Sequence, residues 1–438
     1  MAFLDNSVAD DIIKTLYPDY QAPEELRRIN PFYSTIQKMT DFGGKSLEVP
    51  LIIGSPQGGG STFAEALAAN NTSGAYSNMF ASFTLTRKKD YVLATIDGET
   101  IETTDQDDYA MVQVFQKTLD LAFHTALRRI ARHMFRDGTA WIGKVGSIVG
   151  TVITLSNVSD AFNFDPGMRV SLYRTAAVLM DTVRDATEAT PLTVTAVNYE
   201  DGTITVSAAG TIAPDDYITA ANDRTQSGVT AASIFTNSRV ITGVKQWIAG
   251  SQAGAFAAGV PGAQLQQSIY GVDRSVNTAA LAGTAQNCNG MGPDEAIIKL
   301  ASKVNALGGR PDMCWLNPAD FSALVQFLGS RVIYDRVQSV ESAEFGFQAV
   351  VLMGDNGAIK CVSDINVPKS EIFLLQMDTW DLCSAKGAPR VLRRDGNEVL
   401  RVANDDAYQY RVGGYLNMRC RAPNWNGRGY NYLAPTVN

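Results

Sequence analysis

The spacing of hydrophobic and polar positions changes several times along the chain, and the longest regular pattern lies between residues 105 and 135. Apolar side chains recur there every three or four residues, at Met111, Phe115, Leu119, Phe123, Leu127, Ile130 and Met134. This spacing is typical of an amphipathic helix. Asp105, Asp107 and Asp108 lie in the expected first turn and basic residues in the last turns, which suits the helix dipole. We predict one helix of roughly 46 Å at about 1.5 Å per residue.

Two strand-like segments flank a stretch of small and polar residues between Lys45 and Thr104. The segments KSLEVPLII and FTLTRKKDYVLATIDGETI are rich in β-branched and aromatic residues. The stretch GSPQGGGSTFAEALAANNTSGAYSN separates them, and its glycine and serine content favours flexible backbone. We predict an extended β-hairpin loop over residues 45–104 with a mobile tip. Prolines interrupt the short helical patches of residues 1–44, which predicts an extended N-terminal arm.

Short strands rich in Thr and Val, joined by turns, fill residues 143–223. Asp165-Pro166-Gly167 and Asp201-Gly202 are typical turn sequences. We predict an inserted all-β domain. Its Asp215-Asp216 pair raises the possibility of a calcium ion, but the regular oxygen-ligand spacing of a calcium loop is missing. An exposed turn is the preferred interpretation.

Helices and strands alternate in part of the remaining chain, residues 224–438. A capped helix ends at Gly308-Gly309, a buried strand covers Met313 to Leu316, and a second helix starts near Pro318. Four β-type segments follow: QAVVLMG, AIKCVSD, SEIFLLQMDTWDLC and the run from Arg390 to Asn424. The predicted fold class is α+β with a separate β insertion.

Composition narrows the possible functions. Apolar residues make up 45% of the 438 residues and charged residues 19%, as in ordinary folded domains. The net charge of -8 and the pI near 5.0 argue against a protein whose main surface is a nucleic-acid groove. Five cysteines without C-x-x-C spacing predict reduced, buried thiols. The N-terminus has no signal-peptide pattern and no run reaches membrane-span length, so we expect a soluble protein made in the cytosol.

One glycine-rich loop resembles a phosphate-binding loop. Gly54, Gly59 and Ser61 have the spacing of a Walker motif, but Gly60 occupies the lysine position, and nothing else there can reach a terminal phosphate. A flexible loop is the preferred interpretation. A nucleotide-binding enzyme that uses Gly54–Thr62 remains an alternative.

The other candidates for chemistry are weaker. His124 and His133, the two histidines, lie within the predicted helix without Cys or carboxylate partners at ligand spacing, so packed or solvated side chains are expected. Asp405 and Asp406 are adjacent, so their side chains point in different directions. We expect no catalytic residue, no cofactor site and no metal site. A β-rich adhesion or decoration protein is a further alternative, weakened by the long helix.

The order of the predicted parts resembles that of the major capsid proteins of tailed bacteriophages, a fold shared with herpesviruses. Two passages carry the resemblance: GGRPDMCWLNPADFSALVQFLGSR (Gly308 to Arg331) and LRRDGNEVLRVANDDAYQYRVGGYLNMRCRAPN (Leu392 to Asn424). The insertion is similar to the extra β domains that some capsid proteins carry.

The resemblance implies a head protein that self-assembles into an icosahedral shell around double-stranded DNA. The arm (1–44), the extended loop (45–104) and a spine-helix segment of the peripheral domain (105–142) would be followed by the insertion (143–223). The axial domain and the rest of the peripheral domain would occupy residues 224–438. The implied partners are further copies of the chain, in hexamers and pentamers, with scaffolding, portal and decoration proteins; the DNA is enclosed without sequence-specific binding, and no membrane is involved.

The resemblance also implies a place in the virion after assembly in the cytoplasm of a bacterial host. A bacterial nanocompartment shell protein of the same fold is the close alternative. Seven residues are expected at intersubunit contacts: Gly58, Gly59, Gly60, Lys88, Lys89, Arg128 and Arg132. Some family members cross-link subunits through a lysine of the extended loop, which would be Lys88 or Lys89, although no motif identifies such a bond.

Overall fold

A computed structural model describes most of the chain. The described residues are 30–52, 54, 59–72, 80–99, 108–175, 179–183, 191–208, 212–224, 238–250, 268–328, 334–336, 348–354, 357–393, 399–403 and 405–432. The chain divides into two units. The first comprises Met1–Gly43, Arg87–Ala131 and Leu382–Asn417, and the second comprises Gly44–Thr86, Arg132–Asp381 and Met418–Asn438.

The predicted long helix is confirmed as α6 (Asp108–Met134). In the first unit, Ala122 and Ala126 of this helix pack against Val92 and Val412. The acidic residues Asp105 and Asp107, which we expected in its first turn, lie outside the described residues.

The sheet of the first unit is built around β23 (Ala407–Cys420). Strand β4 (Lys88–Asp97) pairs antiparallel with β23 over its whole length. The other partners of the sheet are β22 (Val399–Arg401), β21 (Arg390–Val391), β20 (Trp380–Ser384) and β1 (Gln37–Met39), which follows helix α3 (Pro31–Thr35). An ion pair of 3.0 Å between Arg129 Nε and Asp90 Oδ1 joins α6 to β4.

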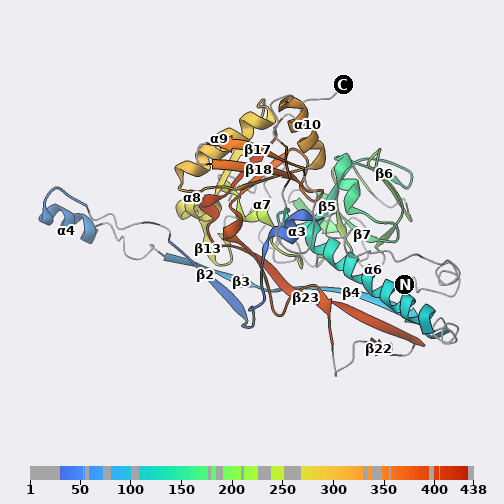
Figure 1. The fold of residues 1–438 in the computed structure, drawn as a ribbon. Coiled ribbons are helices and arrows are strands. Elements are labelled where there is room, and N and C mark those ends of the chain that lie inside the picture. Colours follow the sequence, from blue (N-terminus) through green and yellow to red (C-terminus); the bar gives the residue numbers. More distant parts are fainter. Residues whose placement is uncertain are drawn as a thin grey trace. The chain divides into compact units, whose positions relative to one another are not determined.

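A β-hairpin in the second unit consists of β2 (Ser46–Ile52) and β3 (Phe80–Thr86), which run side by side in Figure 1. The strand pattern that starts at Phe80 is divided at Arg87, because β3 pairs with β2 whereas β4 pairs with β23. Arg87 belongs to the first unit, where its Nη1 donates a 3.0 Å hydrogen bond to the carbonyl of Phe42. Between the hairpin strands lies helix α4 (Phe63–Thr72), where we had predicted a flexible tip.

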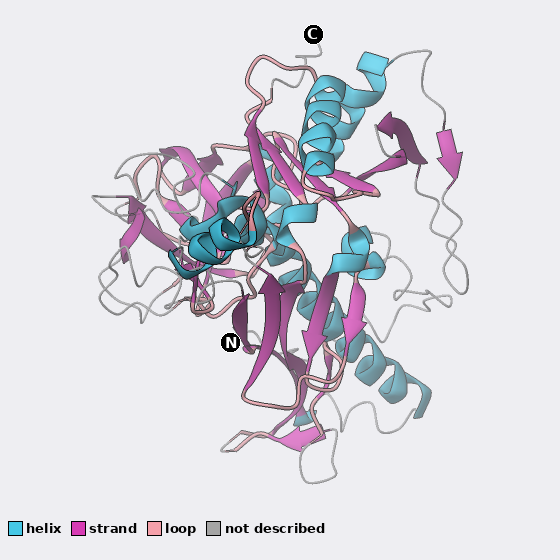
Figure 2. Cartoon of the chain, turned by 90° about the vertical axis from the view of Figure 1, so that its left-hand side faces the viewer, coloured by secondary structure: helices cyan, strands magenta, loops and turns pink. Residues whose placement is uncertain are grey.

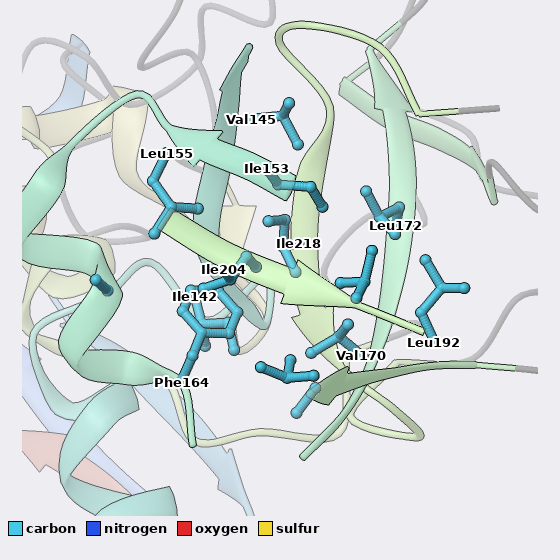
Figure 3. Close-up of a cluster of buried hydrophobic side chains, with 14 residues drawn as sticks. Ile142, Val145, Ile153, Leu155, Phe164, Val170, Leu172, Leu192, Ile204 and Ile218 are labelled. Carbon is cyan, nitrogen blue, oxygen red and sulfur yellow. The ribbon is translucent and has the colours of Figure 1, made fainter. Parts of the chain in front are cut away.

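The predicted all-β insertion is confirmed as a barrel in the second unit. Six strands close in the order β11-β5-β6-β10-β9-β7, because β11 also pairs with β7, and β8 extends the sheet from β7. The elements are β5 (Trp141–Val149), β6 (Val152–Leu155), η1 (Val158–Asn163), β7 (Arg169–Thr175), β8 (Leu179–Val183), β9 (Leu192–Asn198), β10 (Thr203–Val206) and β11 (Tyr217–Ala220). Figure 3 shows the barrel's buried side chains, such as Ile153, Phe164 and Ile204, gathered in its interior. The predicted turns hold, since Gly167 and Gly202 have positive φ angles of 83° and 65°.

The second unit also contains a seven-stranded sheet in the order β14-β24-β19-β15-β18-β17-β16. Its strands are β14 (Thr284–Asn287), β15 (Met313–Leu316), β16 (Tyr334–Arg336), β17 (Gln348–Gly354), β18 (Gly357–Ser363), β19 (Glu371–Leu375) and β24 (Gly427–Tyr430). Helices α9 (Pro293–Ala306) and α10 (Pro318–Leu328) contribute Leu300 and Leu324 to its core. The predicted strand at Met313–Leu316 and the helix start at Pro318 are both confirmed.

Short elements complete the second unit: α7 (Val244–Trp247), β12 (Ser268–Ile269), β13 (Val272–Asp273), η3 (Arg274–Asn277), α8 (Thr278–Ala282), η5 (Met377–Thr379) and η6 (Pro423–Trp425). Helices and strands are both plentiful (Figure 2), so the predicted α+β class is confirmed. No helix among the described residues is long and apolar enough to span a membrane.

Candidate assembly surfaces

The inner face of the β2–β3 hairpin is anchored in the second unit. Side chains alternate between the two faces along each strand. Val49, Phe83 and Leu85 belong to the inner face and are 3% exposed or less. The ring of Phe83 meets that of Trp247 edge-on, with 5.2 Å between their centroids. This packing fixes the base of the hairpin.

The outer face of the same hairpin changes from polar to apolar along its length. It begins with the cross-strand pair Ser46 and Thr86 and ends with the pair Ile52 and Phe80. Ile52 is 70% exposed and Phe80 is 72% exposed. Adjacent large apolar side chains that face water are typical of a surface that another molecule covers. The end of the hairpin is therefore a candidate contact surface.

Helix α4 begins with a capping box, in which a side chain at each end of the first turn binds the other's backbone amide. Thr62 Oγ1 accepts a hydrogen bond of 3.3 Å from the Glu65 amide, and Glu65 Oε2 accepts one of 3.2 Å from the Thr62 amide. The sequence Thr-Phe-Ala-Glu carried this signal, which our interpretation as a flexible loop overlooked. Two apolar side chains of the helix face solvent, Phe63 at 83% and Leu67 at 48% exposure.

Gly60 has a structural role that the sequence did not reveal. A Cβ atom at this position would lie 2.7 Å from the amide nitrogen of Ala66 and 2.8 Å from Cβ of Glu65. At Gly59 nothing lies within 4 Å of the equivalent atom. Gly60 thus allows the chain to approach the first turn of α4 closely, whereas Gly59 stands in open space. Gly58 lies outside the described residues.

The same contacts argue against phosphate binding by this loop. Glu65 Oε2 accepts hydrogen bonds from both the Ser61 hydroxyl, at 2.9 Å, and the Thr62 amide. These hydrogen bonds lower the pKa of Glu65, so its carboxylate carries a negative charge at neutral pH. An anion would meet this charge where a Walker loop offers a lysine. The nucleotide-binding hypothesis therefore loses its proposed site.

The four basic residues expected at subunit contacts differ in exposure. Lys89 is exposed, while Lys88 and Arg128 are half-buried, and burial lowers the pKa of Lys88. Arg132 is only 4% exposed, and its Nη1 lies 3.5 Å from Sδ of Met168. Arg132 is therefore buried within the single subunit, and its place at a subunit contact stays a prediction. The amphipathic pattern did not show this, because the barrel that covers Arg132 comes later in the chain.

A second apolar surface on the first unit was missed from the sequence. Tyr91 is 47% exposed and Leu93 60% exposed, on the face of β4 that points away from Val92 and the helix. The Tyr91 hydroxyl lies 3.1 Å from that of Tyr415, and their rings meet edge-on. The available signal was that β4 carries apolar residues on both faces, which is unusual for a strand with one face in water.

The calcium hypothesis for Asp215 and Asp216 is not supported. Asp215 Oδ1 is 2.6 Å from Nζ of Lys144, and Asp216 Oδ2 accepts a hydrogen bond from the Ala213 amide. The preferred interpretation, an exposed turn, holds for Asp215, but Asp216 is buried at 1% exposure. Nowhere in the described part of the chain do three or more His, Cys, Asp or Glu side chains form a possible metal site.

The expectation of free, buried thiols is confirmed for all five cysteines: Cys288, Cys314, Cys361, Cys383 and Cys420. Burial raises the pKa of Cys420 to about 12, and it also raises that of Cys314. Thiols of this kind are poor nucleophiles because the reactive species is the thiolate. The cysteines therefore act as small core residues.

Comparison with known proteins finds a family model that matches part of the chain. Residues 217–396, less than half of the chain, match the model of the SU10 major capsid protein family. No curated protein matches the sequence.

Several solved structures are similar over nearly the full length at low sequence identity. The capsid of cyanophage A-1(L) has 10% identity, covers 98% of both chains and gives a TM-score of 0.46. A structure of Mycobacterium phage Adephagia has 10% identity, covers 100% of this chain and 99% of the matched chain, and gives a TM-score of 0.38. An encapsulin complex from Synechococcus elongatus has 7% identity, the same coverage of 100% and 99%, and a TM-score of 0.43. TM-scores below 0.5 do not by themselves establish a common fold, so the assignment depends on the family match over residues 217–396.

Over residues 217–396 the chain is thus similar to major capsid proteins, which supports the role of a virion component whose copies form the shell of a phage head. The resemblance seen in the sequence is thereby confirmed. Major capsid proteins are structural and not enzymatic, in agreement with the prediction that the chain is not an enzyme. The match also favours a phage head over the nanocompartment alternative.

Proposed function

We propose that the chain assembles through the end of its β2–β3 hairpin, which lies over a neighbouring copy in an icosahedral shell around double-stranded DNA. The observation that supports this contact is the exposed pair Ile52 and Phe80, 70% and 72% accessible to water. Apolar surface contributes about 25 cal/mol per Å² when it is removed from water. Repetition of one such contact around a closed shell multiplies its effect.

Helix α4 supports the same proposal. A ten-residue helix is marginal in water by itself, because isolated helices need roughly 12–15 residues to persist. Its capping box stabilises the first turn, but Phe63 is 83% exposed and Leu67 48% exposed. A neighbouring copy would cover these side chains. The same contact would include Gly58, Gly59 and Gly60.

The remaining roles follow the expected division of the chain. The arm would be residues 1–44, the extended loop 45–104, the spine-helix segment 105–142, the insertion 143–223, and the axial domain with the rest of the peripheral domain 224–438. Lys88, Lys89 and Arg128 would lie at further contacts between copies in hexamers and pentamers. Scaffolding, portal and decoration proteins would be the other partners, and a chain with a charge of -8 would enclose the DNA without binding it tightly.

The test is the double substitution Ile52→Asp and Phe80→Asp. Two carboxylates at the apolar end should prevent its burial, so we expect folded subunits and fewer than a tenth of the wild-type particles in negative-stain images. Val149→Asp is the matched control, because Val149 is also apolar and 80% exposed but belongs to the barrel. Normal particles from the double variant, with wild-type yield, would refute the hairpin contact.

A further inference from the structure

The barrel is attached to the end of helix α6 by a group of buried charges in the second unit. Nε2 of His133 lies 3.5 Å from Oδ2 of Asp223, and both side chains are about 5–6% exposed. One turn later, Nη2 of Arg136 donates a 2.8 Å hydrogen bond to Oδ1 of Asp160 in the barrel. The helix end thus contacts two carboxylates, one from η1 and one from the segment that leaves β11.

Two further contacts connect the chain around Asp223 and Gly243 to the residues that end helix α6 and precede the barrel. The residue after Asp223, Arg224, donates a 3.2 Å hydrogen bond from Nη1 to the carbonyl of Thr139, just before the barrel begins. A Cβ atom at Gly243 would overlap the carbonyl oxygens of His133 and Arg136, so only glycine lets the chain pass this close to the helix end. We call this group of contacts the barrel junction. Its charged side chains, those of His133, Arg136, Asp160, Asp223 and Arg224, belong to residues that are all 6% exposed or less.

We propose that the barrel junction is an acid-sensitive latch, in which protonation of His133 loosens the attachment of the barrel to α6. A protonated His133 would be a third buried cation beside Arg132 and Arg136, and within the described part of the chain the carboxylate that faces it is that of Asp223. Arg136 already uses Asp160 as its partner. This inference does not depend on the proposed hairpin contact.

The direction of the pH effect follows from where the proton binds more strongly. The pKa of His133 is lowered, and burial is the largest cause. The neighbouring Asp223 raises this pKa in part, and Arg132 and Arg136 lower it further. The closed junction therefore prefers neutral His133, whereas an opened junction exposes a histidine with an ordinary pKa of about 6.5. Stability of the closed form falls as the pH drops below about 6.5 towards the lowered value.

Asp160 contributes to the pH dependence of the junction's stability with the sign opposite to that of His133. Burial raises its pKa, and Arg136 lowers it in part, so the closed junction binds a proton at Asp160 more readily than an opened one. Acid therefore favours the closed form at Asp160 and the open form at His133. A variant that changes only His133 separates the two effects.

Hydrogen exchange at pH 7.5 and 5.5, corrected for intrinsic exchange rates, measures the opening directly. At pH 5.5, one unit below the ordinary histidine pKa, we expect opening of residues 133–141 and 217–224 to increase by up to about tenfold. His133→Gln, which is neutral and can still donate to Asp223, should abolish the increase. His124→Gln is the matched control, because it removes the other histidine of the same helix, and it should respond like the wild type.

A constant opening rate in the wild type, or an equal increase in His133→Gln, would overturn the latch. If circular dichroism shows that His133→Gln does not fold, Asp223→Asn provides a second test. It removes the carboxylate that favours protonated His133, so the acid response should be at least as large as in the wild type. A smaller response in Asp223→Asn would contradict the proposal. All variants are compared in one assembly state, checked by light scattering.

Discussion

The barrel and the hairpin are both antiparallel β structures of the second unit, but they differ in how far they bury their own apolar side chains. The barrel closes on itself, so its strands have paired edges and its apolar side chains fill their own interior. The hairpin buries only its inner face and ends in the exposed pair Ile52 and Phe80. A two-stranded hairpin is marginal by itself in water. The comparison teaches that the barrel buries its apolar side chains by itself, whereas the hairpin leaves an apolar end exposed that we propose a partner covers.

The largest expected effect is the loss of stability when a buried side chain of the barrel core is removed. Phe164 is fully buried in the barrel core, and its replacement by alanine should lower the free energy of unfolding by about 3–5 kcal/mol. Urea unfolding of the purified protein measures this loss. The matched change Ile52→Ala, at the exposed end of the hairpin, should alter the unfolding free energy of the subunit by less than about 0.5 kcal/mol. Equal losses in the two variants would remove the distinction between the regions.

The smallest expected effect concerns two neighbouring glycines of the hairpin. Gly60→Ala should disturb the capping box of α4, because the new Cβ would overlap the backbone of its first turn, whereas Gly59→Ala meets open space. A lost cap weakens a helix by about 1 kcal/mol. Hydrogen exchange of residues 63–72 should therefore increase roughly fivefold in Gly60→Ala alone. Similar exchange in both variants would mean that the glycines serve only backbone flexibility.

The sequence predicted those parts of the fold whose signals are local and regular. Helix α6 has a strong apolar repeat, and the barrel has short turn sequences at Gly167 and Gly202. The strand β15 and the start of α10 at Pro318 were also marked, by a buried apolar run and a helix-initiating proline. Each of these elements is determined largely by residues close together in the chain.

The candidate surfaces were harder to predict because they depend on tertiary contacts. The packing of Gly60 on helix α4 and the place of Arg132 beneath the barrel could not be predicted from residue type alone, and their roles in subunit contacts stay predictions. The pairing of His133 with Asp223 joins segments that are distant in the sequence, on opposite sides of the insertion. The alternation of β4 was visible, but which strand it pairs with was not.

The central claim is that the apolar end of the hairpin is covered by another copy of the chain. A cryo-electron microscopy reconstruction of assembled wild-type particles would test this claim most directly. We predict that Ile52 and Phe80, which are 70% and 72% exposed in the single chain, become buried against a neighbouring subunit. A shell in which both side chains still face solvent would contradict the account.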